Sequence, residues 1–251
     1  MNVAATPILS LRDISRRYGG LQAVDSVSLD VIPGRLHSIV GPNGAGKSTL
    51  FNCICGVDRA DRGTIEFRGK RIERLPAWRI SRLGIARKFQ APSLFPELTV
   101  AENVHVAVTG RQSWFQLARR ARRVQQQEAV EYCLHDMELE HCAELTSQNL
   151  AHGEQQRLEL AMVLATEPTL MLLDEPTAGL SAGEVDAMAK MLRRLNDRVP
   201  TLVVEHDLAF IRQVSDWITV LDQGRLLAEG EADEIAANER VRVAFLGRQE
   251  L

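Results

Sequence analysis

The sequence has little of what a membrane span, a nucleic-acid coat or a secretory leader requires. Its longest apolar runs are only a few residues, far short of the roughly 20 that cross a bilayer. The formal net charge is −3 and the pI is ≈ 6.1, which excludes an overall basic surface, so no nucleic-acid partner is expected. The first residues show no charged region followed by an apolar block, so we expect a cytoplasmic protein without a signal peptide.

Cysteine is also scarce, with four in 251 residues: Cys53, Cys55, Cys133 and Cys142. Cys53 and Cys55 are separated by one residue on an expected helix and so lie on different faces of it. We therefore expect four buried or half-buried thiols rather than a disulfide or metal framework. The apolar content of 45% and the charged content of 25% are ordinary for a globular domain with a sizeable core.

What the sequence does contain is a complete G-x-x-x-x-G-K-S loop, Gly41 to Ser48, directly after the apolar run 36–40. A strand that feeds a glycine-rich turn and then a helix presents backbone N–H groups and the positive end of the helix dipole to a phosphate. Lys47 can reach the β- and γ-phosphates, and Ser48 can hold Mg²⁺. The loop predicts a site for a nucleoside triphosphate.

The pattern around this loop predicts an α/β fold. Strand character alternates with helical segments in the second half, which indicates a parallel sheet buried on both faces. Residues 26–31 alternate strictly, as a half-buried antiparallel strand does, and residues 99–143 are helical in pattern. The expected strands are 8–11, 24–31, 36–40, 63–69, 84–89, 169–173, 201–204, 217–221 and 225–228. We expect a parallel core, an antiparallel β subdomain, an inserted helical subdomain and a terminal helix.

Two carboxylates follow the apolar strand at 169–173. Asp174 and Glu175 then lie at the carboxyl end of a parallel strand, where ligand sites form in α/β proteins. Asp174 can hold Mg²⁺ together with Ser48, and Glu175 can orient the attacking water or take its proton. The alternative is a solvated strand end, but the phosphate loop upstream favours the metal site.

The order of these and later motifs resembles the ATP-binding cassette (ABC) family of ATPases across nearly the whole chain. Leu150-Ala-His-Gly-Glu154 matches the signature motif that opens a helix, and Ala178-Gly-Leu-Ser181 lies where the family has its D-loop. The resemblance implies a P-loop NTPase fold in one ABC ATPase domain, 1–251. Its nucleotide-binding core is then 1–90 and 168–251, and its helical subdomain is 91–167.

The resemblance also implies roles for single residues. Gln90, at a strand end, would sense Mg²⁺ and the attacking water, and His206 would contact the γ-phosphate. Tyr18 falls where the family stacks an aromatic ring on adenine, although 16–20 could equally be a strand-end loop. The expected catalytic residues are Lys47, Gln90, Glu175 and His206, the metal ligands are Ser48, Gln90 and Asp174, and the nucleotide-binding residues are Tyr18, Gly41, Asn43, Gly44, Ala45, Gly46, Lys47, Ser48, Thr49, Ala151, His152 and Gly153.

The signature departs from the usual Leu-Ser-Gly-Gly-Gln of the family. Ala151 removes a serine hydroxyl, and with it one hydrogen bond to phosphate of roughly 1.5–3 kcal/mol. Glu154 places a negative charge where glutamine is usual, and Ser181 replaces the D-loop aspartate. In the family this segment clamps ATP bound by a second subunit, so the resemblance implies a head-to-tail dimer with two composite ATP sites.

Finer resemblance is to ATPases of branched-chain amino-acid and urea importers, on residues 84–103, 150–153, 204–207 and 243–247. Lys88-Phe-Gln90 with Pro92-Ser93 leans towards the urea and short-chain amide members, and Ala151 towards the amino-acid members. This implies ATP hydrolysis at the cytoplasmic face of the inner membrane, with a second ATPase subunit, two transmembrane permeases and, indirectly, a periplasmic solute-binding protein as partners. The alternatives are an envelope-lipid exporter or a soluble non-transport ABC ATPase.

Two segments have more than one interpretation. Residues 93–103 are the expected coupling region, but Thr99 and Glu102 also form the pattern of a capping box at a helix start. The basic block 119–123 could serve nucleic acid, a solvated helical face or docking near anionic lipid headgroups.

Overall fold

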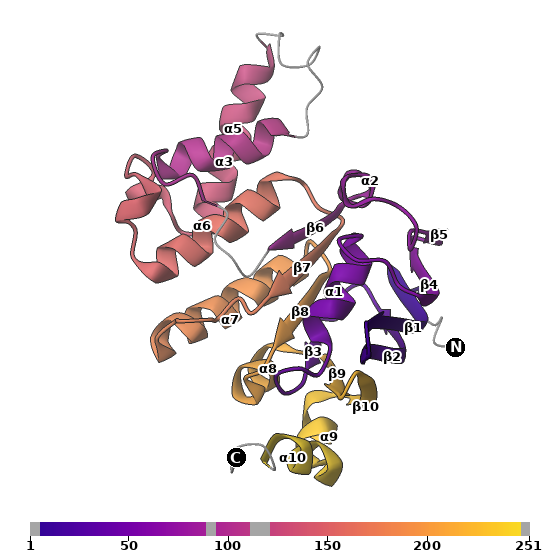
Figure 1. The fold of residues 1–251 in the computed structure, drawn as a ribbon. Coiled ribbons are helices and arrows are strands. Elements are labelled where there is room, and N and C mark those ends of the chain that lie inside the picture. Colours follow the sequence, from indigo (N-terminus) through magenta and orange to yellow (C-terminus); the bar gives the residue numbers. More distant parts are fainter. Residues whose placement is uncertain (1–5, 89–93, 111–120, 247–251) are drawn as a thin grey trace, which may run out of the picture.

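The computed structural model describes residues 6–88, 94–110 and 121–246. Its larger sheet has six strands in the order β10-β9-β3-β8-β7-β6 (Figure 1). β6 pairs with β7, β7 with β8, β8 with β3 and β3 with β9, all parallel, while β10 returns antiparallel to β9. The strands are β3 (His37–Val40), β6 (Ile85–Lys88), β7 (Leu170–Asp174), β8 (Thr201–Glu205), β9 (Trp217–Asp222) and β10 (Arg225–Gly230).

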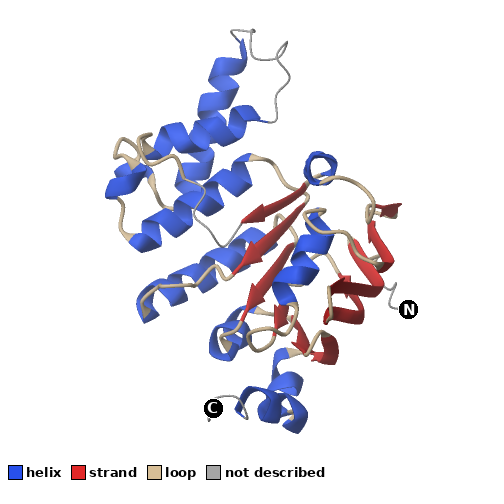
Figure 2. Cartoon of the chain, viewed as in Figure 1, coloured by secondary structure: helices blue, strands red, loops and turns tan. Residues whose placement is uncertain are grey.

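A second, antiparallel sheet has the order β2-β1-β4-β5 and lies on the opposite side of the molecule from the helical subdomain (Figure 2). It comprises β1 (Leu9–Tyr18), β2 (Leu21–Val31), β4 (Arg62–Phe67) and β5 (Lys70–Arg71). In β2 the residues Val27, Leu29 and Val31 are buried and those between them are not, as the strict alternation predicts.

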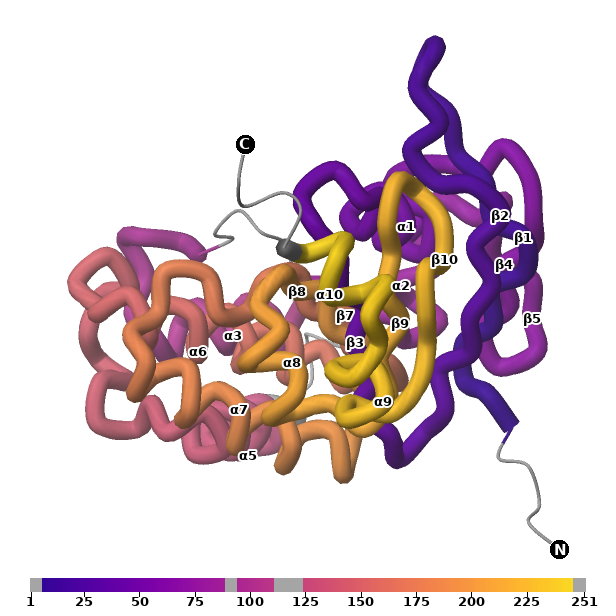
Figure 3. Tube along the Cα trace, turned by 90° about the horizontal axis from the view of Figure 1, so that it is seen from below, coloured from indigo at the N-terminus to yellow at the C-terminus, as the bar shows by residue number. Residues whose placement is uncertain are grey.

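Helices cover both faces of the parallel sheet. The core helices are α1 (Lys47–Cys55), α2 (Ala77–Leu83), α7 (Ala182–Asn196), α8 (Leu208–Val214), α9 (Ala232–Ala237) and α10 (Glu239–Leu246). The helical subdomain contains α3 (Val100–Gly110), α5 (Ala121–Asp136), η1 (Glu140–Cys142), η2 (Ser147–Asn149) and α6 (His152–Ala165). Seen from below, the C-terminal helices lie between the helical subdomain and the antiparallel sheet (Figure 3).

The period of two in the strands divides the apolar core between these layers. In β7, Leu170 and Leu172 face the cluster shared with α1 and the antiparallel sheet. Met171 and Leu173 face the cluster shared with α6, α7 and α8. A strand buried on both faces has no polar side to expose, which explains its unbroken apolar run.

The fold class is as predicted, and all four cysteines are buried and unpaired, as expected. The expected first strand, 8–11, is wrong in length because β1 continues to Tyr18. The strand continues through its polar residues because its pairing register with β2 shifts after Leu11, where Asp13 takes a left-handed φ of 53°. The capping box is also confirmed: Thr99 N–H donates to Glu102 Oε2 at 2.8 Å, and Glu102 N–H to Thr99 Oγ1 at 3.1 Å.

Parts of three predicted segments lie outside the described residues. They include Gln90 and Ser93, then Arg119 and Arg120 with the side chains of 121–123 in the basic block, and Gly247 of the C-terminal motif. Within the described ranges, no helix is both long enough and apolar enough to cross a bilayer.

Candidate functional site

The phosphate loop begins where the central strand β3 ends. At Gly41 a Cβ would lie 2.2 Å from the carbonyl oxygen of Leu221 on β9, so only glycine fits there. Gly46 precedes the first turn of α1 with a φ of 99°. The strand, the turn and the helix therefore follow each other as the sequence predicts, with the first turn of α1 open to an anion.

Lys47 is folded over this loop and is almost fully buried. Its Nζ donates to the carbonyl oxygens of Gly41 at 2.6 Å and Pro42 at 3.2 Å. Burial lowers the pKa of Lys47, and the negative charges of Glu175, Asp174 and Glu205 oppose that shift. Lys47 thus faces the acidic ends of β7 and β8, while Asn43, Gly44 and Ser48 are exposed.

The ends of β7 and β8 bring the predicted Glu175 and His206 together. His206 Nδ1 lies 3.5 Å from Glu175 Oε1 and 3.6 Å from Glu205 Oε2. Glu175 has a left-handed φ of 47°, which is unusual for a residue other than glycine, and its N–H donates to Val204 O at 2.9 Å. Strained backbone of this kind is common at functional sites.

Glu205 is a residue that the sequence reasoning missed. It is fully buried, and its Oε1 accepts from the N–H of Thr177 at 3.1 Å and from the Thr177 hydroxyl at 2.5 Å. Its Oε2 accepts from the N–H of His206. One buried carboxylate thus fixes the segments after Glu175 and before His206. The only sequence signal was an acidic residue at the end of an apolar strand.

Arg87 was missed as well. Its guanidinium donates to Asp174 Oδ2 at 2.6 Å and to Asn52 Oδ1 of α1 at 2.6 Å, and the paired side chains of Arg87 and Asp174 are 7% and 3% exposed. Arg87 therefore provides the counter-charge that a buried carboxylate needs. The Ser48 hydroxyl and the Asp174 carboxylate are hard oxygen donors that fit Mg²⁺.

Tyr18 lies at the end of β1 and is 40% exposed. Its hydroxyl donates to Asp58 Oδ2 at 2.5 Å, and the Arg16 guanidinium carbon is 4.7 Å from the ring centroid. Burial first, and then the bond to Asp58, raise the pKa of Tyr18, with Thr49 also within hydrogen-bond reach. The ring is thus held beside the first turn of α1.

The signature segment opens α6, with Ala151 as the cap residue. Glu154 turns back on the helix start: its Oε2 accepts the N–H of Ala151 at 2.9 Å, and its Oε1 lies 2.9 Å from His141 Nε2. Pairing with His141, and then the Ala151 N–H, hold the pKa of Glu154 below its usual range. Its carboxylate is therefore held by two partners of the same chain, at the start of its own helix.

The rest of the signature lies against the D-loop of the same chain. His152 Nε2 is 2.9 Å from Ala178 O, and a Cβ at Gly179 would come within 2.7 Å of that ring. Gly153 packs against Glu184 of α7, where a Cβ would lie 2.3 Å from Glu184 Oε1. The signature residues thus gather at the D-loop, and the phosphate-loop residues at the end of β3.

Residues 24–178 match the family model described as "ABC transporter". This match spans more than half of the sequence. The chain belongs to the ABC transporter family. The predicted ABC ATPase and its fold class are thereby confirmed, while the roles of individual site residues remain predictions.

The relatives of this ABC protein agree with that placement. It is 40% identical over 252 residues to the high-affinity branched-chain amino acid transport ATP-binding protein LivG of Escherichia coli, covering 96% of this chain and 98% of LivG. It is 38% identical to the corresponding protein BraF of Pseudomonas aeruginosa, with the same coverage. The ADP conformation of MJ1267, an ATP-binding cassette of an ABC transporter, superimposes with a TM-score of 0.85 at 27% identity, covering 97% of this chain and 100% of MJ1267.

A second solved cassette bears on assembly. The dimeric structure of MJ0796, a bacterial ABC transporter cassette, matches with a TM-score of 0.78 at 28% identity, covering 89% of this chain and 98% of MJ0796.

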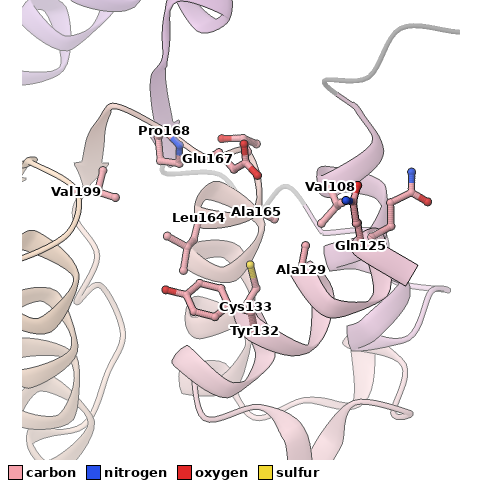
Figure 4. A pocket seen from close by; sticks show the side chains of 12 residues that line it. Val108, Gln125, Ala129, Tyr132, Cys133, Leu164, Ala165, Glu167, Pro168 and Val199 are labelled. Atoms are coloured by element: carbon pink, nitrogen blue, oxygen red, sulfur yellow. The ribbon is translucent and has the colours of Figure 1, made fainter. Parts of the chain in front are cut away.

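A pocket of about 480 Å³ lies apart from the candidate nucleotide site, between α5 and the end of α6 (Figure 4). Tyr132, Cys133, Leu164 and Pro168 are among its lining residues, and none of the predicted nucleotide-binding residues is. Burial raises the pKa of the Cys133 thiol to about 12, so this sulfur is not a nucleophile.

Proposed function

We propose that this chain binds and hydrolyses Mg-ATP and that its dimer powers import of branched-chain amino acids through partner permeases. The observation that carries the proposal is the meeting of Lys47, Asp174, Glu175 and His206 at the carboxyl edge of one parallel sheet. Ligand sites of α/β proteins form at this edge.

The site residues divide the work of phosphoryl transfer. The backbone of the phosphate loop and Lys47 hold the β- and γ-phosphates, and Tyr18 offers a ring face to adenine. Ser48 and Asp174 would hold Mg²⁺, with Gln90 as the further predicted ligand, and the bound ion would neutralise charge on the phosphate oxygens. Glu175 orients water or takes its proton, and His206 donates to the γ-phosphate as negative charge develops there.

One chain contributes half of each site. There is one phosphate loop in the sequence, and the signature residues Ala151, His152 and Gly153 gather at the D-loop instead of that loop. Head-to-tail pairing would place the signature of one subunit against ATP in the other. The N-terminus of α6 then supplies N–H groups and a dipole to the γ-phosphate, which offsets the missing serine.

Branched-chain amino acids are proposed as the solute because LivG and BraF are named for their transport. Urea or a short-chain amide is the second candidate, favoured by Lys88 in the motif before Gln90. Because the ATPase does not touch the solute, permeases and a periplasmic binding protein would select it. The chain would then sit peripherally on the cytoplasmic face of the inner membrane, as a homodimer or with a sister ATPase.

Hydrolysis is tested by steady-state turnover of Mg-ATP, with a Lys47→Ala chain as the control and partner proteins present. We expect turnover well above the control. Equal rates for the two proteins would refute the enzymatic proposal.

Transport is tested by isolating tagged Glu175→Gln protein from native membranes with Mg-ATP, followed by mass spectrometry. Two hydrophobic permeases and a sister ATPase are the expected partners, and uptake of labelled leucine against labelled urea then identifies the solute. Recovery of ribosomes or nucleic acid would instead favour the soluble ATPase, and recovery of lipid-export components the exporter.

A further inference from the structure

A buried ion pair joins the nucleotide-binding sheet to the signature helix. Lys88 Nζ at the end of β6 lies 2.8 Å from Glu159 Oε2 on α6, and the side chains are 3% and 6% exposed. Among the described ion pairs, only this one and Arg87–Asp174 have both partners less than a tenth exposed. Arg87–Asp174 stays inside the core, whereas Lys88–Glu159 connects the core to the helical subdomain.

Strand geometry explains how β6 makes both pairs. Successive side chains of a strand point to opposite faces, so Arg87 turns to Asp174 and α1 while Lys88 turns to α6. β6 is the last strand of the sheet and pairs only with β7 among the described strands. Its carboxyl end is therefore tied to the proposed metal ligand on one side and to the signature helix on the other.

A second contact on the same face of α6 completes the attachment. Glu159 follows His152 by seven residues, so the two lie about two helical turns, or roughly 10 Å, apart on one face. His152 reaches the D-loop carbonyl of Ala178 at 2.9 Å. Two polar contacts along one face, to the D-loop and to β6, define the direction of the helix axis relative to the sheet.

The pair also faces a groove of about 310 Å³ between α2, β6 and α6. Apolar side chains of Val57, Ile80 and Met162 line this groove together with Lys88 and Glu159. Removing Lys88 takes away the cation that lies 2.8 Å from the Glu159 carboxylate, and weakening a buried ion pair in this way favours opening to water. Here the opening would separate α6 from the sheet edge.

We propose that the Lys88–Glu159 pair fixes the orientation of the signature helix against the sheet, so that both residues are positioning residues for the composite ATP site. This inference rests on the proposed function for its effect on dimerisation. Lys88 and Glu159 are not themselves predicted ligands of the nucleotide or the metal, so their loss should leave ATP binding by the monomer largely unchanged.

Orientation is measured by spin labels on cysteines introduced at Glu128 of α5 and Lys190 of α7, both exposed. The four native cysteines are buried, and labelling of the parent protein measures their background. In the nucleotide-free full chain, Lys88→Met should shift or broaden the distance distribution, and the charge swap Lys88→Glu with Glu159→Lys should restore it. The matched control is Arg194→Met, which removes the exposed Arg194–Glu138 pair between α7 and the helical subdomain and should leave the distribution unchanged.

The functional arm uses the Glu175→Gln background with Mg-ATP. Lys88→Met should raise the dimer dissociation constant at least about tenfold, while a fluorescent ATP analogue binds the monomer with affinity within about twofold of the parent. An unchanged label distribution overturns the proposal, and so does a changed distribution with unaltered dimerisation.

If the Glu175→Gln parent itself forms no dimer, the composite site of the proposed function fails, while the label distances still decide whether the pair orients the helix. If the charge swap does not fold, Lys88→Met with Glu159→Met serves instead: it should recover stability but not the label distribution, and recovery of both would contradict the proposal.

Discussion

At the level of single residues, Glu154 shows how a departure from a family motif can keep the local structure of the motif. Its carboxylate caps its own helix at the N–H of Ala151 and contacts His141 Nε2, so both carboxylate oxygens have partners within the chain. Glutamine, the usual residue, also suits this third position of a capping box. Glutamate in place of glutamine therefore gives His141 a carboxylate partner and leaves the cap at Ala151 intact.

Glu154→Gln should consequently be nearly neutral, whereas Glu154→Ala should lower the free energy of unfolding by about 1 kcal/mol through loss of the cap. Urea denaturation of the two variants and the parent provides the measurement. An equal loss in both variants would mean that the bond to His141, and not the cap, carries the stability.

The phosphate loop offers a matched pair of glycines. Gly44 and Gly46 both have positive φ, 80° and 99°, so alanine at either costs roughly 1–2 kcal/mol. Only at Gly46 would a Cβ also meet backbone, 2.3 Å from Ala23 O. Gly46→Ala should therefore destabilise the chain by clearly more than Gly44→Ala in urea denaturation, and both should weaken ATP binding. Equal stabilities would show that the loop relaxes away from β2.

At the level of elements, the strands were predictable because the parallel sheet is buried on both faces and its apolar runs are short and bounded. The phosphate loop, Asp174 and Glu175 were predictable because each follows such a run, and His206 was predicted from the resemblance to the family. Arg87 and Glu205 were not, since their roles depend on which strand ends meet across the sheet. Their partners, Asp174 and Thr177, are distant from them along the chain, and no local pattern records that contact.

One element-scale consequence is a pH dependence that arises in β3. His37 is fully buried with Nε2 2.8 Å from Thr219 Oγ1, and burial lowers its pKa from 6.5 to about 4. The unfolded chain takes up this proton near pH 6.5 and the native chain only near 4, so acidification through that window favours unfolding. The contribution of the neutral His37 to the free energy of unfolding is fully present above pH 6.5, and about 3 kcal/mol of it is lost by pH 4.

Urea denaturation at several pH values tests this, with His37→Gln as the comparison. The difference in free energy of unfolding between the two proteins should change with pH between 6.5 and 4, and it should be constant above pH 6.5. Parallel curves through the window would mean that His37 is not the group responsible.

At the level of the whole molecule, the site elements divide into two groups. β3, β7 and β8 bring the phosphate loop and the carboxylates to one sheet edge, and α6 holds the signature at the D-loop. The resemblance to the dimeric cassette MJ0796 is in keeping with an arrangement in which each group needs a second chain. A variant that blocks one group should then be complemented by a variant that blocks the other.

Two variants make this a direct test. Lys47→Ala disables the phosphate loop, and Ala151→Glu, at an exposed cap residue, places negative charge where the partner's γ-phosphate would lie. A dimer of either variant alone would have no intact site, but a mixed dimer would have one intact site of two. Because half of the dimers in an equal mixture are mixed, ATPase activity should recover to about a quarter of the parent's. Mixtures as inactive as the separate variants would indicate that loop and signature act within one chain or that both sites must be intact. Dimerisation with Mg-ATP separates these two cases, because only the composite arrangement gives the mixture an intact site and so lets it dimerise where neither variant does alone.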